Sequence, residues 1–278
     1  MAAIALALGS SLVWGCADFL GGMLTRRLAL AGVTVVSQGA GFVALTLWLG
    51  GDGFQLDARA FWLGALAGIG GGLGLLAFYK ALAVGTMSVV SPVAACGALV
   101  PFALSLATGE RPSGLVVGGA VAALAGAVLA SAEEHASTEP GRRQGALLAL
   151  VAAFALGLFV YFLGLAGKHG ATLSALFGAR VGSLALLVTA VLVTRSKLRL
   201  TRRDVPAVAL LGLLDTGANA LFVLASARGY LSIVSVLGSL YPVVTVLAAH
   251  LVLGERISRA QRWGVAVALA GVAVVASG

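Results

Sequence analysis

The stretch GERPSGLVVGGAVAALAG, residues 109–126, returns near the end of the chain as GERISRAQRWGVAVALAG, residues 254–271. A single shift of 145 positions, from Gly109 to Gly254, superposes the two copies. In both copies a Gly-Glu-Arg turn with a serine two residues later is followed by a run of small apolar residues. A charged turn and a small-residue helix repeated at one offset predict that the chain consists of two related halves.

The composition places these halves in a membrane. Hydrophobic residues make up 60% of the 278 positions and charged residues only 10%, with a mean hydropathy of +1.06. A water-soluble domain carries roughly 25% charged residues, because water must solvate its surface. The long continuous apolar runs exclude a closed barrel, whose strands alternate polar and apolar residues. The sequence therefore predicts an all-α integral membrane protein.

Apolar runs of about 20 residues are long enough to cross a bilayer as helices, and the chain contains ten of them. We expect these spans at residues 2–24, 32–50, 60–80, 86–108, 113–132, 144–166, 171–194, 205–227, 231–253 and 258–277. The first repeat then covers residues 1–132, the second covers residues 144–278, and residues 133–143 form a linker loop. Because each repeat holds an odd number of spans, the second enters the membrane inverted, which is the plan of many secondary transporters.

Several other classes of function are disfavoured. The net charge of +8 is spread over short loops, which indicates loops retained on one side of a membrane and no nucleic-acid partner. Cys16 and Cys96 lie inside apolar spans, without a CxxC pair or a histidine cluster, so we expect no disulfide and no metal site. The chain has no HExxH, GxSxG or Walker motif. We therefore expect no catalytic residues, no cofactor and no enzymatic activity.

The sequence resembles the drug/metabolite transporter superfamily, specifically the proteins built from two EamA domains. The resemblance rests on Leu12-Val13-Trp14-Gly15 in the first span, on the two Gly-Glu-Arg turns, and on Tyr241-Pro242, whose proline precedes Glu255 by thirteen residues. It covers nearly the whole chain. It implies a ten-helix, multi-pass carrier of small organic solutes in a cytoplasmic (inner) membrane of the prokaryotic type.

Two positions depart from the pattern of that family. Relatives often carry arginine in the middle of the second and seventh helices, whereas here the seventh has Arg180 and the second has Gln38. The first half has Gly97 where the second has Pro242, with Pro92 and Pro101 on either side.

Three charged residues fall well inside the predicted spans, namely Asp18, Arg180 and Asp215. A charge in a bilayer core is costly, so each is a candidate functional residue. Trp14 precedes Asp18 by four residues and Asn219 follows Asp215 by four, so each pair shares a helix face. We expect both faces to line a substrate cavity. The alternative is that Arg180, a structural counter-ion in our interpretation, pairs permanently with one of the carboxylates and only fixes helix packing.

Further candidates are aromatic, hydroxyl or proline residues at predicted bends. Proline removes a backbone hydrogen bond and bends a helix, which exposes a carbonyl and provides a hinge. We expect the fourth and ninth helices, which the repeat relates, to carry the gates. The remaining substrate-binding candidates are Tyr79, Ser91 and Tyr241, and the structural or gating candidates are Gln38, Arg180, Pro92, Pro101 and Pro242.

The fifth and tenth spans carry small-residue faces. Gly119 and Gly126 in the fifth correspond to Gly264 and Gly271 in the tenth. Such faces let membrane helices approach closely. They indicate packing either between the two halves or between two protomers of a homodimer.

The orientation of the helices stays open. Of the 18 lysines and arginines, 13 fall in or beside odd-numbered loops, four in even-numbered loops, and one is Arg180. The positive-inside rule places the odd loops in the cytoplasm and both termini outside. The family resemblance implies cytoplasmic termini instead.

Together these features predict a secondary transporter that works by alternating access on small metabolites with apolar bodies, such as amino acids or drugs. Buried carboxylates form the proton relays of many carriers, so H+ is the candidate coupling ion. One alternative is a channel or scaffold without alternating access. A remote one is an intramembrane enzyme that uses Asp18 and Asp215 as an acid/base pair.

Overall fold

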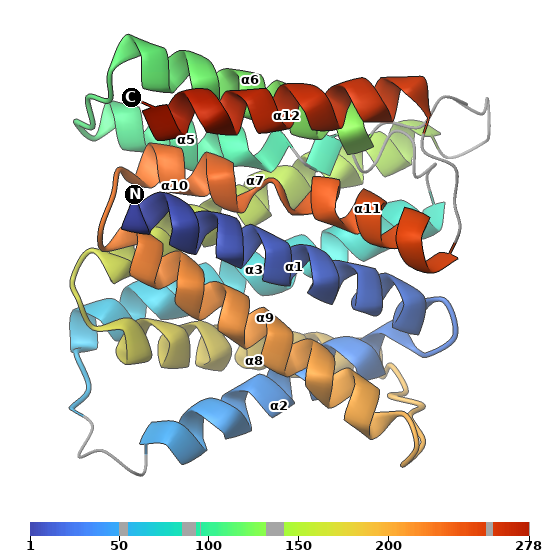
Figure 1. The fold of residues 1–278 in the computed structure, drawn as a ribbon. Coiled ribbons are helices and arrows are strands. Elements are labelled where there is room, and N and C mark those ends of the chain that lie inside the picture. The colour runs from blue at the N-terminus through green and yellow to red at the C-terminus, as the bar shows by residue number, and fades with distance from the viewer. Residues whose placement is uncertain (50–54, 85–92, 95, 132–141, 254–257, 278) are drawn as a thin grey trace.

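The structure is a computed structural model that describes residues 1–49, 55–84, 93–94, 96–131, 142–253 and 258–277. Over these residues the chain forms helices and no strands (Figure 1). The helices are α1 (Ala2–Thr25), α2 (Leu30–Leu49), α3 (Ala58–Val84), η1 (Cys96–Ala98), α5 (Leu99–Ala107), α6 (Gly114–Ser131), α7 (Arg142–Gly167), α8 (Thr172–Thr194), α9 (Val205–Ser226), α10 (Leu231–Gly238), α11 (Tyr241–Leu253) and α12 (Arg259–Ser277).

The helices are those of a membrane protein. Among the described residues, eight helical segments are long and apolar enough to span a bilayer, one of which, Leu231–Val252, comprises α10 and α11. Cys96–Ala107 and Gly114–Ala130 are shorter apolar helices. Large apolar side chains such as Trp48, Trp62 and Trp263 point outward and are mostly exposed. An apolar outer surface of this extent is stable only against lipid. The prediction of an all-α, multi-pass membrane protein is thus confirmed.

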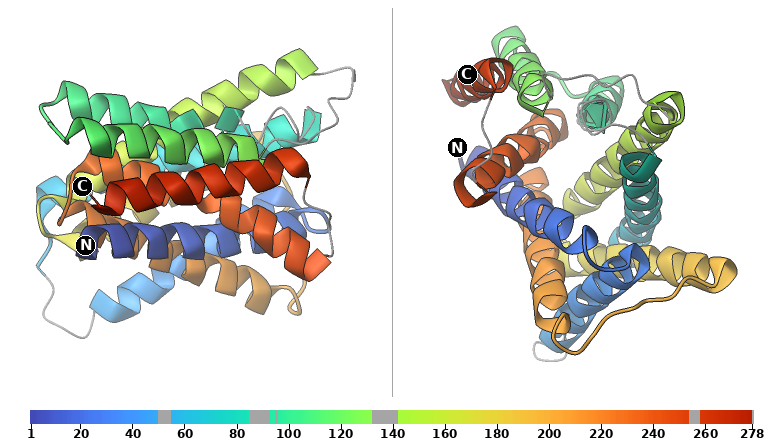
Figure 2. Two further views of the ribbon diagram at one scale, coloured as in Figure 1. Left: turned by 45° about the horizontal axis from the view of Figure 1, so that its top comes forward. Right: turned by 90° about the vertical axis from the view of Figure 1, so that its right-hand side faces the viewer.

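The two halves of the sequence interleave. Each long helix of the first half packs mainly on helices of the second: α1 on α9 and α11, α2 on α8 and α9, α3 on α7 and α8, and α6 on α12. Figure 2 shows these helices side by side in two further views. Lipid offers no hydrophobic driving force for helix association, so close backbone approach at small residues stabilises such contacts.

The small-residue faces of α6 and α12 pack on each other inside the molecule. A Cβ added at Gly126 would overlap the backbone nitrogen of Ala268, and one at Gly264 would overlap that of Ala130. The glycines therefore join the two halves of one chain. Of the two interpretations of these faces, packing between the halves is the one that the structure supports.

The predicted span 231–253 consists of two helices. It breaks at Ser239 and Leu240, and Pro242 is the second residue of α11. Proline fits there because the first turn of a helix leaves its N–H groups without intrahelical partners. Pro101 lies in the same way in the first turn of α5, directly after the 3₁₀ helix η1. The predicted span 86–108 begins among residues 85–92, which lie outside the described residues, as do Ser91 and Pro92.

Both termini lie at the same end of the molecule (Figure 1). The last residues of α2 and the loops after α5, α7 and α9 share that end, which we call the terminal end, and the loops after α1 and α8 lie at the opposite one. Residues 195–204 at the opposite end pass over the start of α2, where a Cβ at Gly32 would overlap the carbonyl oxygen of Leu198. This opposite end carries Arg26, Arg27 and five further cations of residues 195–204, and we call it the basic end.

Candidate functional site

Arg180 is the centre of a polar network between α2, α8 and α9. Its residue is 3% exposed, and its Nη1 lies 2.7 Å from Oδ2 of Asp215. The same Nη1 donates a hydrogen bond to Oε1 of Gln38, and Nε2 of Gln38 donates to Oδ2 of Asp215 at 3.2 Å. Ser183 Oγ donates to the same Gln38 oxygen at 3.0 Å. Gln38 thus bridges the two members of the ion pair.

This network decides which carboxylate Arg180 neutralises. Among the described residues, Arg180 pairs with Asp215, and no ion pair joins it to Asp18. A buried guanidinium needs a charged partner and further acceptors. Asp215 and Gln38 supply them to Nη1, whereas the buried Nη2 has no hydrogen-bond partner among the described residues. The glutamine that departs from the family pattern fits its surroundings, because an arginine in its place would bring a second cation against Arg180.

Asp18 differs from Asp215 in having no ion pair or hydrogen bond with the described part of the chain. It lies on the inner face of α1, between buried Trp14 and Gly21, yet its own side chain is exposed. The carboxylate of Asp18 is therefore accessible from outside the protein, unlike those neighbours on its helix face. Asp215 is close enough for its charge to act on Asp18.

The second helix of the site is α9, which runs beside α1. Ser10 Oγ of α1 donates to the carbonyl of Ala218 at 2.8 Å, which fixes the register of the two helices. Asn219, 3% exposed, donates from Nδ2 to Oδ2 of Asp215 at 3.4 Å, while its Oδ1 has no partner. Two of the predicted faces, one with Trp14 and Asp18 and one with Asp215 and Asn219, therefore belong to neighbouring helices.

Aromatic rings pack beside these polar groups. The ring of Trp14, 8% exposed, lies 5.5 Å from that of Phe222 in α9 and 6.4 Å from that of Phe159 in α7, measured between ring centroids. Trp14 is thus a buried core residue that packs against two other rings, and both rings come from the second half of the chain.

The other predicted residues lie elsewhere. Tyr241 begins α11, and its carbonyl accepts a hydrogen bond from Thr245 Oγ1 at 3.0 Å, a hydroxyl that also donates to Gly15 of α1 at 3.3 Å. The backbone of Tyr79 belongs to α3, but its side chain lies outside the described residues, as do Ser91 and Pro92. The structure thus brings together Trp14, Asp18, Gln38, Arg180, Asp215 and Asn219.

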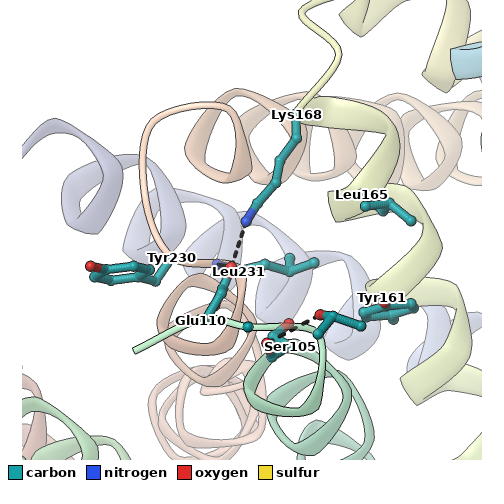
Figure 3. Close-up of a pocket in the computed structure, with 9 residues that line it drawn as sticks. Ser105, Glu110, Tyr161, Leu165, Lys168, Tyr230 and Leu231 are labelled. Atoms are coloured by element: carbon teal, nitrogen blue, oxygen red, sulfur yellow. Dashed lines mark hydrogen bonds and ion pairs between the residues drawn. The ribbon is translucent and has the colours of Figure 1, made fainter. Parts of the chain in front are cut away.

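A second polar site, which the sequence analysis missed, lies at the terminal end. Glu110, in the turn between α5 and α6, accepts hydrogen bonds from the backbone N–H groups of Leu231 and Ser232 at 2.7 and 2.8 Å, and from Ser232 Oγ at 2.7 Å. Its Oε1 also pairs with Nζ of Lys168 at 2.5 Å. Glu110 therefore caps the N-terminus of α10 from the other half of the chain (Figure 3).

Glu110, Lys168 and Leu231 border a pocket of about 510 Å³ that Ser105, Tyr161 and Tyr230 also line. Burial by itself raises the pKa of Glu110, but the hydrogen bonds from Lys168, Ser232 and Leu231 outweigh it, and the pKa lies below its usual value. Glu110 is consequently a carboxylate at neutral pH. The only sequence signal for this role was the repetition of the Gly-Glu-Arg turn, which names no partner.

Comparison with known proteins gives a family and a fold. Residues 143–277 match the model of the EamA-like transporter family. No curated protein matches the chain. A solved crystal structure superposes with a TM-score of 0.80 at 21% sequence identity and covers 99% of this chain and 98% of its own. At this level of identity the likeness shows a shared fold.

Proposed function

We propose that the chain, whose residues 143–277 match the EamA-like transporter family, is an EamA-domain protein of the drug/metabolite transporter superfamily and a secondary transporter of small organic solutes. It works by alternating access across a cytoplasmic membrane, on ten spans in two inverted sets of five. Carriers of this plan bind their solute near the midplane, where the two repeats meet.

The observation that carries the proposal is the position of Asp18. A carboxylate within a span is retained at a cost, and a structural role would give it a permanent partner. Asp215 has such a partner in Arg180, and Asp18 has none among the described residues. We assign to Asp18 the binding of the solute or of the coupling proton. Trp14 and Asn219 border the same place, and the Gln38–Arg180–Asp215 network holds α2, α8 and α9 in position.

The acid/base enzyme is not the function that this geometry supports. Two carboxylates that share a catalytic water must both be free to exchange protons. Asp215 instead holds an ion pair and accepts hydrogen bonds from two amides.

The remaining alternative is a channel. Flux through a channel would not be accelerated by solute on the opposite side of the membrane.

For the orientation we follow the charges and place the basic end in the cytoplasm. Lysine and arginine in short loops are retained there during insertion. Both termini then lie outside the cytoplasm.

Reconstituted protein tests the function. A metabolite library is first screened by thermal shift, since a ligand that binds the folded state raises its apparent stability. Proteoliposomes loaded with the ligand so found should take up external labelled ligand faster than empty ones. Uptake driven by a pH gradient should be lost in Asp18→Asn. Exchange at equal pH on both sides should persist if Asp18 carries the coupling proton and should be lost as well if Asp18 binds the solute. If internal ligand does not accelerate uptake by the wild-type protein, alternating access is refuted. Uptake driven by the pH gradient that is unchanged in Asp18→Asn refutes the assigned role of Asp18.

A further inference from the structure

The basic end of the molecule carries a surface of cations that the proposed function does not use. This surface combines residues 26–29, after α1, with residues 195–204, which pass over the start of α2. Its cations are all exposed, and we call them the basic patch: Arg26, Arg27, Arg195, Lys197, Arg199, Arg202 and Arg203. Asp204 is the one acidic residue in the same two segments, so the patch has a large net positive charge.

The side chains of the basic patch have no partner in the described part of the chain. None of them forms an ion pair or a side-chain hydrogen bond there. At the terminal end, by contrast, Arg111 donates hydrogen bonds to the carbonyls of Leu106 and Glu110. Arg228 donates to the carbonyl of Leu224. The cations of the basic patch are therefore available to an anion from outside the protein.

The backbone holds the basic patch in a fixed arrangement. Leu200 packs into the apolar cluster between α1, α2 and α9. Oδ2 of Asp204 accepts hydrogen bonds from the N–H and the Oγ1 of Thr201 at 3.0 and 2.6 Å. Arg27 is close enough for its charge to act on Asp204, so the two segments of the patch are neighbours. A loop that only directs membrane insertion needs charge alone, whereas this loop presents its cations at set positions.

Two of the arginines occupy backbone conformations that suit glycine better. The φ angle is 52° at Arg195, which follows the last residue of α8, and 37° at Arg199. Left-handed backbone is strained for a residue with a Cβ, and glycine is the usual residue just after a helix. No side-chain contact within the described chain offsets this strain. Strain of this kind points to a function for the two side chains outside the protein.

The surroundings of the basic patch indicate what binds there. Leu192 and Val193 in the last turn of α8 are 71% and 77% exposed, and Val205 at the start of α9 is 44% exposed. Apolar side chains so exposed face the acyl chains of the bilayer. Residues 195–204 connect these two helix ends, so their cations lie at the level of the lipid headgroups. Guanidinium groups match the oxygens of a phosphate with paired hydrogen bonds.

We propose that the basic patch binds the headgroups of anionic phospholipids. This inference goes beyond the transporter function and does not depend on it, because the basic patch lies outside the solute site. Zwitterionic phospholipids carry a phosphate but no net charge, so the patch should bind them more weakly.

Native mass spectrometry of the full chain tests the proposal, since lipids bound in detergent stay attached to the protein and are counted. The probes are phosphatidylglycerol and phosphatidylcholine with the same palmitoyl and oleoyl chains, offered in equal amounts. Arg195→Gly combined with Arg199→Gly removes two charges at positions where glycine relieves strain. Arg111→Gln combined with Arg228→Gln is the control, because it removes two charges at the terminal end.

A cation next to an anionic headgroup contributes about fivefold to the affinity. We expect wild type to prefer phosphatidylglycerol by at least about tenfold, and the double glycine variant to lose at least about fivefold of that preference. Its Tm in lipid-free detergent should not fall below that of wild type. The control should keep the preference, and high salt should weaken it in both proteins.

Equal binding of the two lipids by wild type, or an unchanged preference in the double glycine variant, would overturn the inference. Displacement of phosphatidylglycerol by an excess of inorganic phosphate would overturn it too, since the patch would then serve a soluble anion. If the double glycine variant loses Tm, the comparison passes to Arg202→Gln combined with Arg203→Gln. An unchanged preference in that variant then decides against the proposal, and a loss at wild-type Tm supports it.

Discussion

Substitution of Glu110 tests whether one carboxylate joins the two halves of the chain at the terminal end. The carboxylate accepts two backbone and one hydroxyl hydrogen bonds at the start of α10, and it pairs with Lys168. Glu110→Ala removes all of these contacts. Glu110→Gln keeps the shape of the side chain but offers one acceptor oxygen and no charge.

The capping bonds outweigh the ion pair. Replacing a helix cap costs about 0.5–2 kcal/mol, and hydrogen bonds to a charged group contribute up to about 3 kcal/mol. The side chain of Lys168 is 37% exposed while that of Glu110 is 10% exposed, so the solvent-screened ion pair contributes less than about 1 kcal/mol. We expect Glu110→Ala to lower the free energy of unfolding by about 2–3 kcal/mol and Glu110→Gln by about 1–2 kcal/mol.

The assay is the apparent Tm in detergent at a fixed heating rate, where 1 kcal/mol corresponds to roughly 2–4 °C for a chain of this size. The Glu110 contribution depends on pH because the folded state lowers the pKa of this group from its ordinary value of 4.5. It is complete above that ordinary value and is lost as the pH falls through the lowered one. The difference in Tm between wild type and Glu110→Gln should therefore be full at pH 7 and shrink below about pH 4.5.

Lys168→Met provides the comparison, because it removes the ion pair and leaves the capping bonds in place. It should change Tm by less than half as much as Glu110→Ala. A larger effect of Lys168→Met would refute the reasoning, and so would a Glu110→Gln difference that does not change with pH.

Two further sets of substitutions test the contact between α6 and α12 and the ion pair of Arg180. Gly126→Val should abolish the monodisperse peak in size-exclusion chromatography, because its side chain would overlap the backbone of α12, whereas Gly118→Val, where a Cβ meets nothing within 4 Å, should elute as wild type. Equal behaviour of the two would contradict the close contact of α6 and α12. Arg180→Met leaves Asp215 without its partner and should cost about 3 kcal/mol, the low end for a buried pair because Asp215 is 27% exposed. Adding Asp215→Asn should restore most of the lost Tm, and failure to do so would show that the guanidinium has another function.

Much of the fold was predictable because lipid imposes a simple rule on composition. Apolar runs of about 20 residues identify helices that cross a bilayer, and the long described helices lie within a few residues of the predicted spans. The break of the ninth span at Tyr241-Pro242 also has a local cause. The pairing of the helices has no such local cause. It depends on which glycines contact which backbone atoms of another helix, as Gly126 contacts Ala268.

The residues of the site could be predicted from the sequence, but which of them form the ion pair could not. Asp18, Arg180 and Asp215 stood out because each is charged within an apolar run. One sequence could not decide which carboxylate Arg180 neutralises, since that depends on the geometry between α1, α8 and α9. The role of Glu110 was out of reach for the same reason, as its partners Leu231 and Ser232 lie more than 100 positions away in the sequence.

The interleaving of the halves restricts how alternating access can operate. If the two sequence halves moved as rigid bodies, each of the contacts of α1 with α9, α3 with α7 and α8, and α6 with α12 would have to shear at once. Several of these contacts involve backbone against glycine, as at Gly126 and Gly264, and these contacts leave little room for sliding. The units that move under our proposal are therefore bundles that mix helices of both halves. Glu110 then acts as a contact that must break when the terminal end opens, since it holds the loop after α5 to the start of α10.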